Sequence, residues 1–179
     1  MDQSSTSPRF AAAALALETD AGTWLASVIE RLRAAGLTLG GMNSADTEGG
    51  PWECRRPMYL CDLLTGETIK ISQDLGSGAE GCALDTGQLA LAGRSIHRAI
   101  EAGVSLIIVN KFGAQEAAGA SMRDELFAAA EAGVPVLTTV KPELVQAWCE
   151  FVGELGQLLP ADAESVEAWC RAVCATHDR

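Results

Sequence analysis

The amino-acid sequence predicts an α/β protein built as a three-layer sandwich, in which helices cover both faces of a mainly parallel sheet. Two segments carry this prediction, because each joins a helical pattern to a strand-like apolar run across one glycine. The first is Thr86–Ala102 followed by Val104–Val109, and the second is Glu116–Ala132 followed by Val134–Val140. Glycine commonly ends helices, and unbroken apolar runs of this length are typical of central parallel strands. Regular alternation of the two is the pattern of an α/β sheet.

A β-hairpin is predicted at one edge of this sheet. Thr65-Gly66 separates Arg56–Leu64 from Glu67–Ser72, and Ile69 and Ile71 alternate with polar residues in the second segment. Alternation with a period of two on the far side of a short glycine-containing turn indicates two antiparallel strands.

The other elements follow from the same periodicities. Apolar positions over Trp24–Leu32 recur at helical spacing, with Asp20 or Thr23 as the N-cap and Gly36 as the stop. Asn43–Pro51 is rich in glycine and acids and is predicted to be a loop. The remaining strands and helices are expected over Phe10–Leu17, Leu37–Met42, Pro142–Phe151 and Ala161–Thr176.

Length and composition predict one domain over residues 9–179, preceded by a frayed polar tail at residues 1–8. A chain of 179 residues can bury one core without disulfides or metals. The longest apolar run, Phe10–Leu17, is well short of the roughly 20 residues that span a bilayer. It follows Arg9 and is open to reading as a secretory signal, but one basic residue makes a weak start to a signal, and a buried first strand is favoured.

Charge and hydropathy argue against nucleic acid and membranes as partners. The sequence has 13 Lys+Arg against 24 Asp+Glu, and its formal charge of −11 repels polyanions at long range. The six cysteines show no paired short spacing. We therefore expect reduced thiols in the cytoplasm and no disulfide.

Neither a metal centre nor a catalytic triad is expected. Cys170, Cys174 and His177 share one face of the last predicted helix. Three ligands on one terminal helix lack the second loop that usually completes a zinc site. His97 has no companion nucleophile in the sequence, so no triad can be drawn around it.

Ligands of open α/β sheets bind beyond the carboxyl ends of parallel strands, which places candidate sites after Leu17, Val109 and Val140. The first of these ends reads Glu18–Trp24, with one glycine and no lysine. A P-loop needs glycines and a lysine to hold phosphates, and the two acids here would repel them. Hydrolysis by an ordinary P-loop ATPase is therefore disfavoured.

The second strand end carries Asn110, Lys111, Phe112 and Gly113. Asn110 stands where a P-loop enzyme has an acid to hold magnesium, and an amide supplies no negative charge. It can still donate and accept hydrogen bonds, while Lys111 offers a cation to an anionic ligand. A strand-ending turn with a solvated lysine is the alternative.

Glu116, Gly119 and Arg123 follow at helical spacing and are expected to share one helix face. If that face borders a ligand, Gly119 leaves space and Arg123 grasps an oxyanion with its two-pronged guanidinium. The alternative is a pair of surface charges on a solvated helix.

A glycine-rich turn before the helix at Thr86 supplies the other half of the predicted site. Successive N–H groups in such a turn can form an anion nest. Asp85 either borders the ligand or caps the helix. Cys82 is either an acidified thiolate or a small apolar plug. The residues of the predicted nest are Gly76, Ser77, Gly78 and Gly81.

Taken together, these motifs resemble the bacterial family called domain of unknown function 2478. The likeness runs from Phe10 to Val173 and is most specific where Asn110–Gly113 is followed by Glu116. The resemblance implies a P-loop-like nucleoside-triphosphatase fold without the P-loop. Because genes of the family often lie near molybdenum-transport genes, it also implies a role in handling molybdate, tungstate or a nucleotide-like ligand. The stretches that carry it are Thr65-Gly66, Ile69–Gln73, Gly76–Asp85 and Leu106–Gly113, with Glu116, Gly119 and Arg123.

This chain departs from the family pattern, which has arginine at the position of Ala83 and an arginine-glycine pair at Ala120-Ser121. The loss of two cations weakens an oxyanion site and leaves Lys111, Arg123 and the turn amides. The leading hypothesis is therefore a non-catalytic protein that binds a small anion, either a molybdate- or tungstate-type oxyanion or a nucleotide, in molybdenum metabolism.

Two alternatives to this hypothesis stay open. One is a divergent nucleoside triphosphatase in which Glu116 or Asp85 replaces the missing magnesium ligand. The other is an interaction module or homo-oligomer that uses exposed edges of Trp148 and Trp169.

Overall fold

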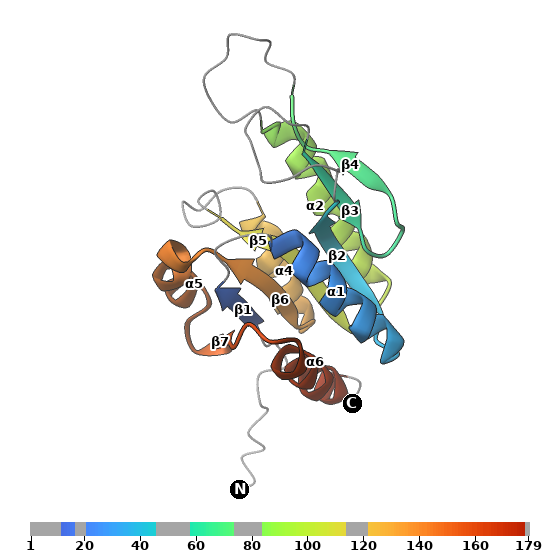
Figure 1. Ribbon diagram of the computed structural model, residues 1–179. Helices are drawn as coiled ribbons and strands as arrows, with labels where there is room; N and C mark the ends of the chain where they lie inside the picture. The colour runs from blue at the N-terminus through green and yellow to red at the C-terminus, as the bar shows by residue number, and fades with distance from the viewer. Residues whose placement is uncertain (1–11, 17–20, 46–57, 74–83, 114–121, 178–179) are drawn as a thin grey trace, which may run out of the picture.

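The computed structural model describes residues 12–16, 21–45, 58–73, 84–113 and 122–177, and within them a single sheet forms the centre of the molecule (Figure 1). The strand order is β4-β3-β2-β5-β6-β1-β7. All neighbouring pairs are parallel except β2 with β3 and β3 with β4, which are antiparallel. The strands are β1 Ala12–Ala16, β2 Leu39–Ser44, β3 Tyr59–Asp62, β4 Thr68–Lys70, β5 Leu106–Phe112, β6 Val136–Val140 and β7 Gly156–Leu159.

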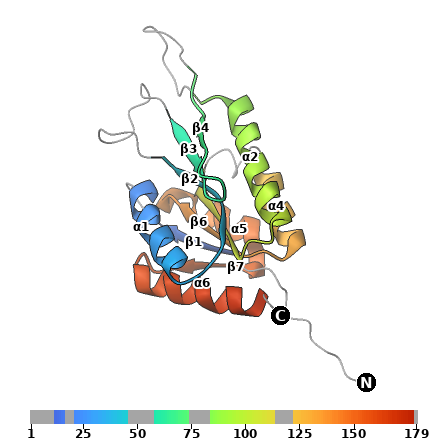
Figure 2. The ribbon, with the colours of Figure 1, turned by 90° about the vertical axis from the view of Figure 1, so that its right-hand side faces the viewer.

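Helices cover both faces of this sheet. Figure 2 shows α1 and α6 on one side and α2 and α4 on the other. None of the described helices is long and apolar enough to cross a membrane. The helices are α1 Ala21–Ala34, α2 Thr86–Glu101, α4 Arg123–Ala132, α5 Val145–Val152 and α6 Ala163–His177, with short 3₁₀ turns η1 Pro142–Leu144 and η2 Gly153–Leu155.

Alternate residues of β5 enter two separate hydrophobic clusters. Ile107 and Val109 pack with α2, α4 and α5, whereas Leu106 and Ile108 pack with α1 and α6. Successive side chains of a strand point to opposite faces, so a strand buried on both faces has to be apolar throughout. This confirms the predicted three-layer α/β sandwich, and the β3–β4 hairpin confirms the predicted sheet edge.

Several element boundaries differ from the sequence predictions. β2 continues through Asn43 and Ser44, which were predicted to begin a loop. β5 continues through Phe112 because its last residue still pairs with Val140 of β6. Thr23 lies inside α1 rather than at its N-cap. Interstrand pairing extends each strand past the point where its apolar run stops.

Two further elements differ from the sequence analysis, and residues 116–121 of one predicted helix lie outside the described residues. The helix predicted over Glu116–Ala132 begins at Arg123 in α4, with Met122 as its N-cap. Strand β7 was not predicted, because it is short, contains Gly156 and Gln157, and is defined by its pairing with β1. Such a segment has little strand propensity of its own.

The predicted exposure of Trp148 is wrong. Trp148 is 1% exposed. Its ring meets that of Phe112 edge-on, at 5.3 Å between ring centroids. Trp169 is half-buried and packs against the α1–α6 side of the core. Trp148 is therefore a core residue, whereas Trp169 lies at the margin of the core.

Candidate functional site

Three polar side chains form a hydrogen-bonded row at the carboxyl ends of β2, β5 and β6. Thr139 Oγ1 donates to Asn110 Oδ1 at 3.1 Å, and Asn110 Nδ2 donates to Ser44 Oγ at 2.6 Å. With the amide in this orientation, the O–H of Ser44 has no acceptor among the described residues. Aligned hydrogen bonds polarise one another. The hydroxyl of Ser44, at the end of the row, is therefore left to act as a hydrogen-bond donor.

The first turn of α1 lies directly over this row. A Cβ at Gly22 would be 3.0 Å from Ser44 Cβ and 3.7 Å from Asn110 Nδ2, so the absence of a side chain permits the close approach. Asn43, which is 5% exposed, donates to the carbonyl of Gly22 at 3.2 Å. We call Gly22, Asn43, Ser44, Asn110 and Thr139 the strand-end site.

The strand-end site also contains an orphaned acceptor. Asn43 Oδ1 is buried and has no hydrogen-bond partner among the described residues. Buried polar atoms are paired in most native proteins, so an orphan calls for a water or a ligand group that donates to it. The site therefore combines one available donor, on Ser44, with one acceptor, on Asn43, beside the positive end of the α1 dipole.

Thr138 holds the end of β5 in place for this arrangement. Its Oγ1 donates to the carbonyl of Val109 at 2.6 Å and accepts from the N–H of Phe112 at 3.1 Å. These bonds bridge the point where the β5–β6 register shifts, between Val109 and Phe112. The peptide bond between Asn110 and Lys111 within this stretch is cis. The hydroxyl thus replaces the ladder bonds that the irregular strand gives up.

The structure separates the four residues predicted at the end of β5. Asn110 belongs to the strand-end site, and Lys111 is exposed beside it. Phe112 is 1% exposed and lies in the core, so its side chain is removed from the predicted ligand surface. Gly113 is half-buried and follows the strand. Alternation along the strand accounts for the opposite fates of Lys111 and Phe112.

Asp85 lies apart from the strand-end site. Its Oδ1 accepts from the N–H of Gln88 at 3.0 Å, which is the N-cap bond of α2. Its own N–H donates to the carbonyl of Ile71, just after β4. Strands β3 and β2 stand between β4 and β5 in the sheet. The capping alternative for Asp85 therefore describes its contacts, and this residue is not part of the strand-end site.

The guanidinium of Arg123 packs against two aromatic rings, one on α4 and one on α5. Its guanidinium carbon lies 5.6 Å from the ring centroid of Phe127 and 5.2 Å from that of Phe151, a cation–π arrangement. The other predicted site residues lie outside the described residues: Gly76, Ser77, Gly78, Gly81, Cys82, Glu116 and Gly119.

The two cysteines of α6 are buried in the core. Cys170 and Cys174 are 0% and 1% exposed. Burial raises the pKa of the Cys170 thiol to about 12, so it stays protonated at neutral pH. Cys174 Sγ donates to the carbonyl of Ser105 at 3.2 Å. A cluster of side chains able to hold a metal is absent from the described part of the chain.

Sequence reasoning missed Asn43, Ser44 and Thr139. A usable signal was present, because Asn43-Ser44 and Thr138-Thr139 are polar pairs within or directly after apolar strand runs. Polar residues at the end of a buried strand are typical of sites at the carboxyl edge of a sheet.

The fold is that of an α/β protein with an open, mainly parallel sheet between two layers of helices. The structure is similar to the "Solution Structure of a Human Cancer-Related Nucleoside Triphosphatase", with a TM-score of 0.60 and 13% sequence identity. The likeness covers 96% of this chain and 99% of that chain. At this identity it shows the fold alone.

Residues 10–169 match the family described as "Protein of unknown function (DUF2478)", and the chain belongs to this family. It is also 42% identical over 154 residues to the "Molybdenum import ATP-binding protein ModC 2" of Bradyrhizobium diazoefficiens. That match covers 86% of this chain but 17% of the relative. The match therefore spans only a small part of that relative's length.

Proposed function

We propose that the chain is a cytoplasmic, non-catalytic binding protein for a small anionic ligand in molybdenum metabolism. The ligand is a molybdate- or tungstate-type oxyanion or a nucleotide. The observation that carries the proposal is the row Thr139–Asn110–Ser44, which ends in a hydroxyl donor under the start of α1. The name of the 42% identical relative supports the molybdenum context.

Neutral side chains support binding rather than hydrolysis. Asn43, Ser44, Asn110 and Thr139 carry no charge, so within the described residues the strand-end site offers no carboxylate to hold magnesium. Phosphoryl transfer depends on metal ions that neutralise the developing charge. An oxyanion requires only aligned donors and positive potential.

A local source of positive potential is needed because the chain as a whole carries a formal charge of −11. Lys111 is exposed on β5, next to Asn110 in the chain. The α1 dipole contributes a partial positive charge at the same edge. We include the amides of Gly76–Gly81 as further donors of the proposed site, as the sequence predicts.

Calorimetry with molybdate, tungstate, ATP and GTP tests the proposal. Heat from at least one ligand is expected with the unchanged protein, and no heat from any of the four would defeat it. Ser44→Ala removes the terminal donor, and affinity should fall by roughly 10- to 100-fold, as for one hydrogen bond to a charged group. Ser27→Ala is the matched control, because this exposed serine on α1 bonds the carbonyl of Trp24 within its own helix.

A divergent nucleoside triphosphatase is the second candidate. It is favoured by the fold shared with a nucleoside triphosphatase and by the ATP-binding name of the relative. Phosphate release above background by the unchanged protein with Mg²⁺ would establish it in place of a non-catalytic role.

Asn110→Asp separates the two candidates in one variant. A carboxylate at this position accepts from both Ser44 and Thr139, so the Ser44 proton turns away from the ligand and a negative charge faces it. The binding proposal therefore expects ligand affinity to fall at least about tenfold. A hydrolase that lacks its magnesium acid would instead gain Mg²⁺-dependent phosphate release. Asn110→Ala, which cannot recruit magnesium, is the control for simple loss of the amide.

A further inference from the structure

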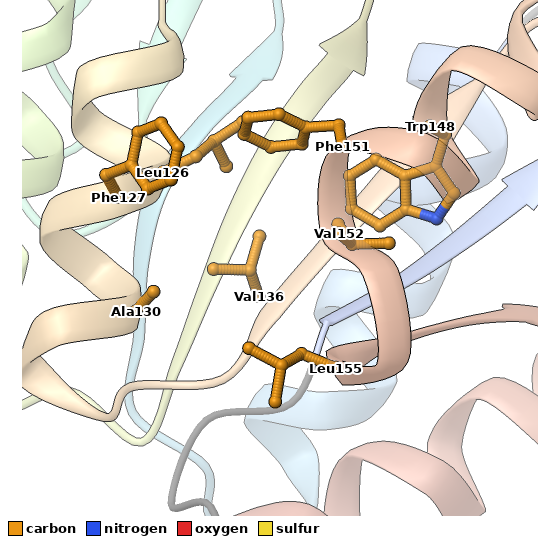
Figure 3. A pocket seen from close by; sticks show the side chains of 8 residues that line it. All are labelled: Leu126, Phe127, Ala130, Val136, Trp148, Phe151, Val152 and Leu155. Carbon is orange, nitrogen blue, oxygen red and sulfur yellow. The ribbon is translucent and has the colours of Figure 1, made fainter.

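An apolar hollow lies between α4 and α5. Figure 3 shows side chains of α4 facing those of α5 and η2 across Val136 of β6. The cavity volume is about 60 Å³, which suits one aliphatic side chain and is too small for a nucleotide. We call it the α4–α5 groove, and its principal lining residues are Phe127, Val136, Trp148, Phe151, Val152 and Leu155.

The rim of the α4–α5 groove exposes large apolar side chains. Phe127 is 49% exposed and Leu155 is 42% exposed. Leu158 of β7 is 43% exposed and extends the same surface, because a Cβ on Gly156, two residues earlier, would meet Val152 of α5. Two of the five exposed large apolar side chains in the described residues therefore line this groove, and a third, Leu158, lies on the same face of the sheet. Clustering of this kind marks an interaction surface more often than scattered apolar residues do.

Side chains of opposite charge lie beside the groove. Arg123 opens α4 and lies over Phe127 and Phe151, and the described residues provide it with no carboxylate partner. Glu154 lies in η2 beside Leu155, after the end of α5, and it is exposed and unpaired within the same residues. The surface thus has a hollow, an exposed leucine on its rim, a cation beside Phe127 and Phe151, and an anion beside Leu155.

We propose that a second copy of this chain covers the α4–α5 groove. A twofold contact must be self-complementary, since the same patch serves both partners. This patch meets that condition: Leu155 of each copy fills the hollow beside Phe127 and Phe151 of the other, and Arg123 of each copy pairs with Glu154 of the other. An unrelated partner explains the hollow but not the presence of both charges on one surface.

Sedimentation equilibrium at about 0.15 M salt, where exposed charges are partly screened, tests the proposal. The unchanged protein should dimerise, and a strict monomer at every soluble concentration would overturn the inference. Arg123→Glu and Glu154→Arg should each weaken the dimer about tenfold, by placing like charges opposite one another. The double variant Arg123→Glu/Glu154→Arg should restore it, because the pair is recreated with its sign reversed.

Two controls separate this contact from general effects on folding. Leu155→Asp should abolish the dimer, whereas Leu91→Asp, at a 45% exposed leucine on α2, should leave it unchanged. Circular dichroism melts establish that each variant is folded. Single charge variants that dimerise as well as the unchanged protein, or a double variant without recovery, would exclude this surface as the dimer contact.

Discussion

Asp62 shows how one buried carboxylate organises the hairpin. It is 0% exposed at the end of β3, where its Oδ1 accepts from the N–H groups of Leu64 and Thr65 at 2.9 and 3.2 Å. Its Oδ2 accepts from Arg98 Nη2 of α2 at 2.8 Å. Burial raises the pKa of Asp62, but the hydrogen bonds from Ser95, the two turn amides and Arg98 together hold it below its usual value. The carboxylate therefore joins the β3–β4 turn to α2.

This lowered pKa predicts a pH-dependent contribution to stability. Because the pKa of Asp62 is lower in the folded than in the unfolded protein, its contribution is complete above the unfolded pKa and is lost as pH falls through the folded one. Asp62→Asn should cost about 2 kcal/mol at pH 7, and the difference from the unchanged protein should shrink below about pH 4. Urea unfolding at pH 7 and pH 3 measures it, with the exposed Glu67→Gln as control. A difference independent of pH would contradict the assignment.

At the scale of elements, β2 is constrained by glycine between two neighbouring strands. Gly41 has φ +87°, and a Cβ there would lie 2.1 Å from the carbonyl oxygen of Ile108 on β5. On its other side, the carbonyl of Gly41 accepts from the N–H of Leu63 at 2.9 Å. Strand β2 is thus packed closely against β5 on one side and hydrogen-bonded to the residue after β3 on the other. Its position in turn sets that of Asn43 and Ser44, so the strand-end site depends on this close approach.

A pair of glycine variants separates backbone strain from steric overlap. Gly66 in the hairpin turn has φ +77°, but a Cβ at this position would meet nothing within 4 Å, so Gly66→Ala should cost about 1–2 kcal/mol from conformation alone. Gly41→Ala adds the overlap with β5 and should cost at least about 2 kcal/mol more. Denaturant midpoints of the two variants provide the comparison. Equal losses of stability in the two variants would show that β2 can shift to accommodate a side chain at position 41.

At the scale of the whole molecule, two clusters share one sheet. Ile96 of α2 belongs to one cluster and Leu32 of α1 to the other, and both are 0% exposed. The strands between them contribute side chains to both clusters. Loss of either cluster therefore exposes one face of every central strand, and we expect the domain to unfold as one cooperative unit.

Truncation on each face tests this cooperativity. Ile96→Ala and Leu32→Ala should each destabilise the protein by about 2–5 kcal/mol. Fluorescence and circular dichroism should follow the same single transition in both variants. The exposed Leu91→Ala should change stability by less than about 0.5 kcal/mol. Separate transitions for the two faces would show that the clusters belong to independent units.

Local patterns allowed much of the fold to be predicted. Helix α2 with its stop before Gly103, the buried strand β6 and the β3–β4 hairpin follow from periodicity and from glycine positions. These signals arise from neighbours in sequence, so they persist without knowledge of the tertiary fold. Strand β7 was not predicted, because its pairing with β1 joins segments from almost opposite ends of the chain and leaves no local sequence pattern.

The candidate site was predictable only in part, for the same reason. Asn110 could be placed at a strand end, but its partners Ser44 and Thr139 are 66 and 29 residues away in sequence. Arg123 was predicted as an anion ligand, and only the position of α5 reveals that its guanidinium lies over Phe151.

By itself, the sequence determined the fold class, the hairpin, the absence of lysine between Glu18 and Trp24, and the neutral Asn110 near the end of β5. These are properties of residue identity and short-range periodicity. Only the tertiary structure decided which polar side chains meet at the strand ends, that Trp148 and Phe112 are core residues, and that an apolar groove opens between α4 and α5. The physical reason is that contacts between distant segments depend on strand order and helix packing, which no local pattern encodes.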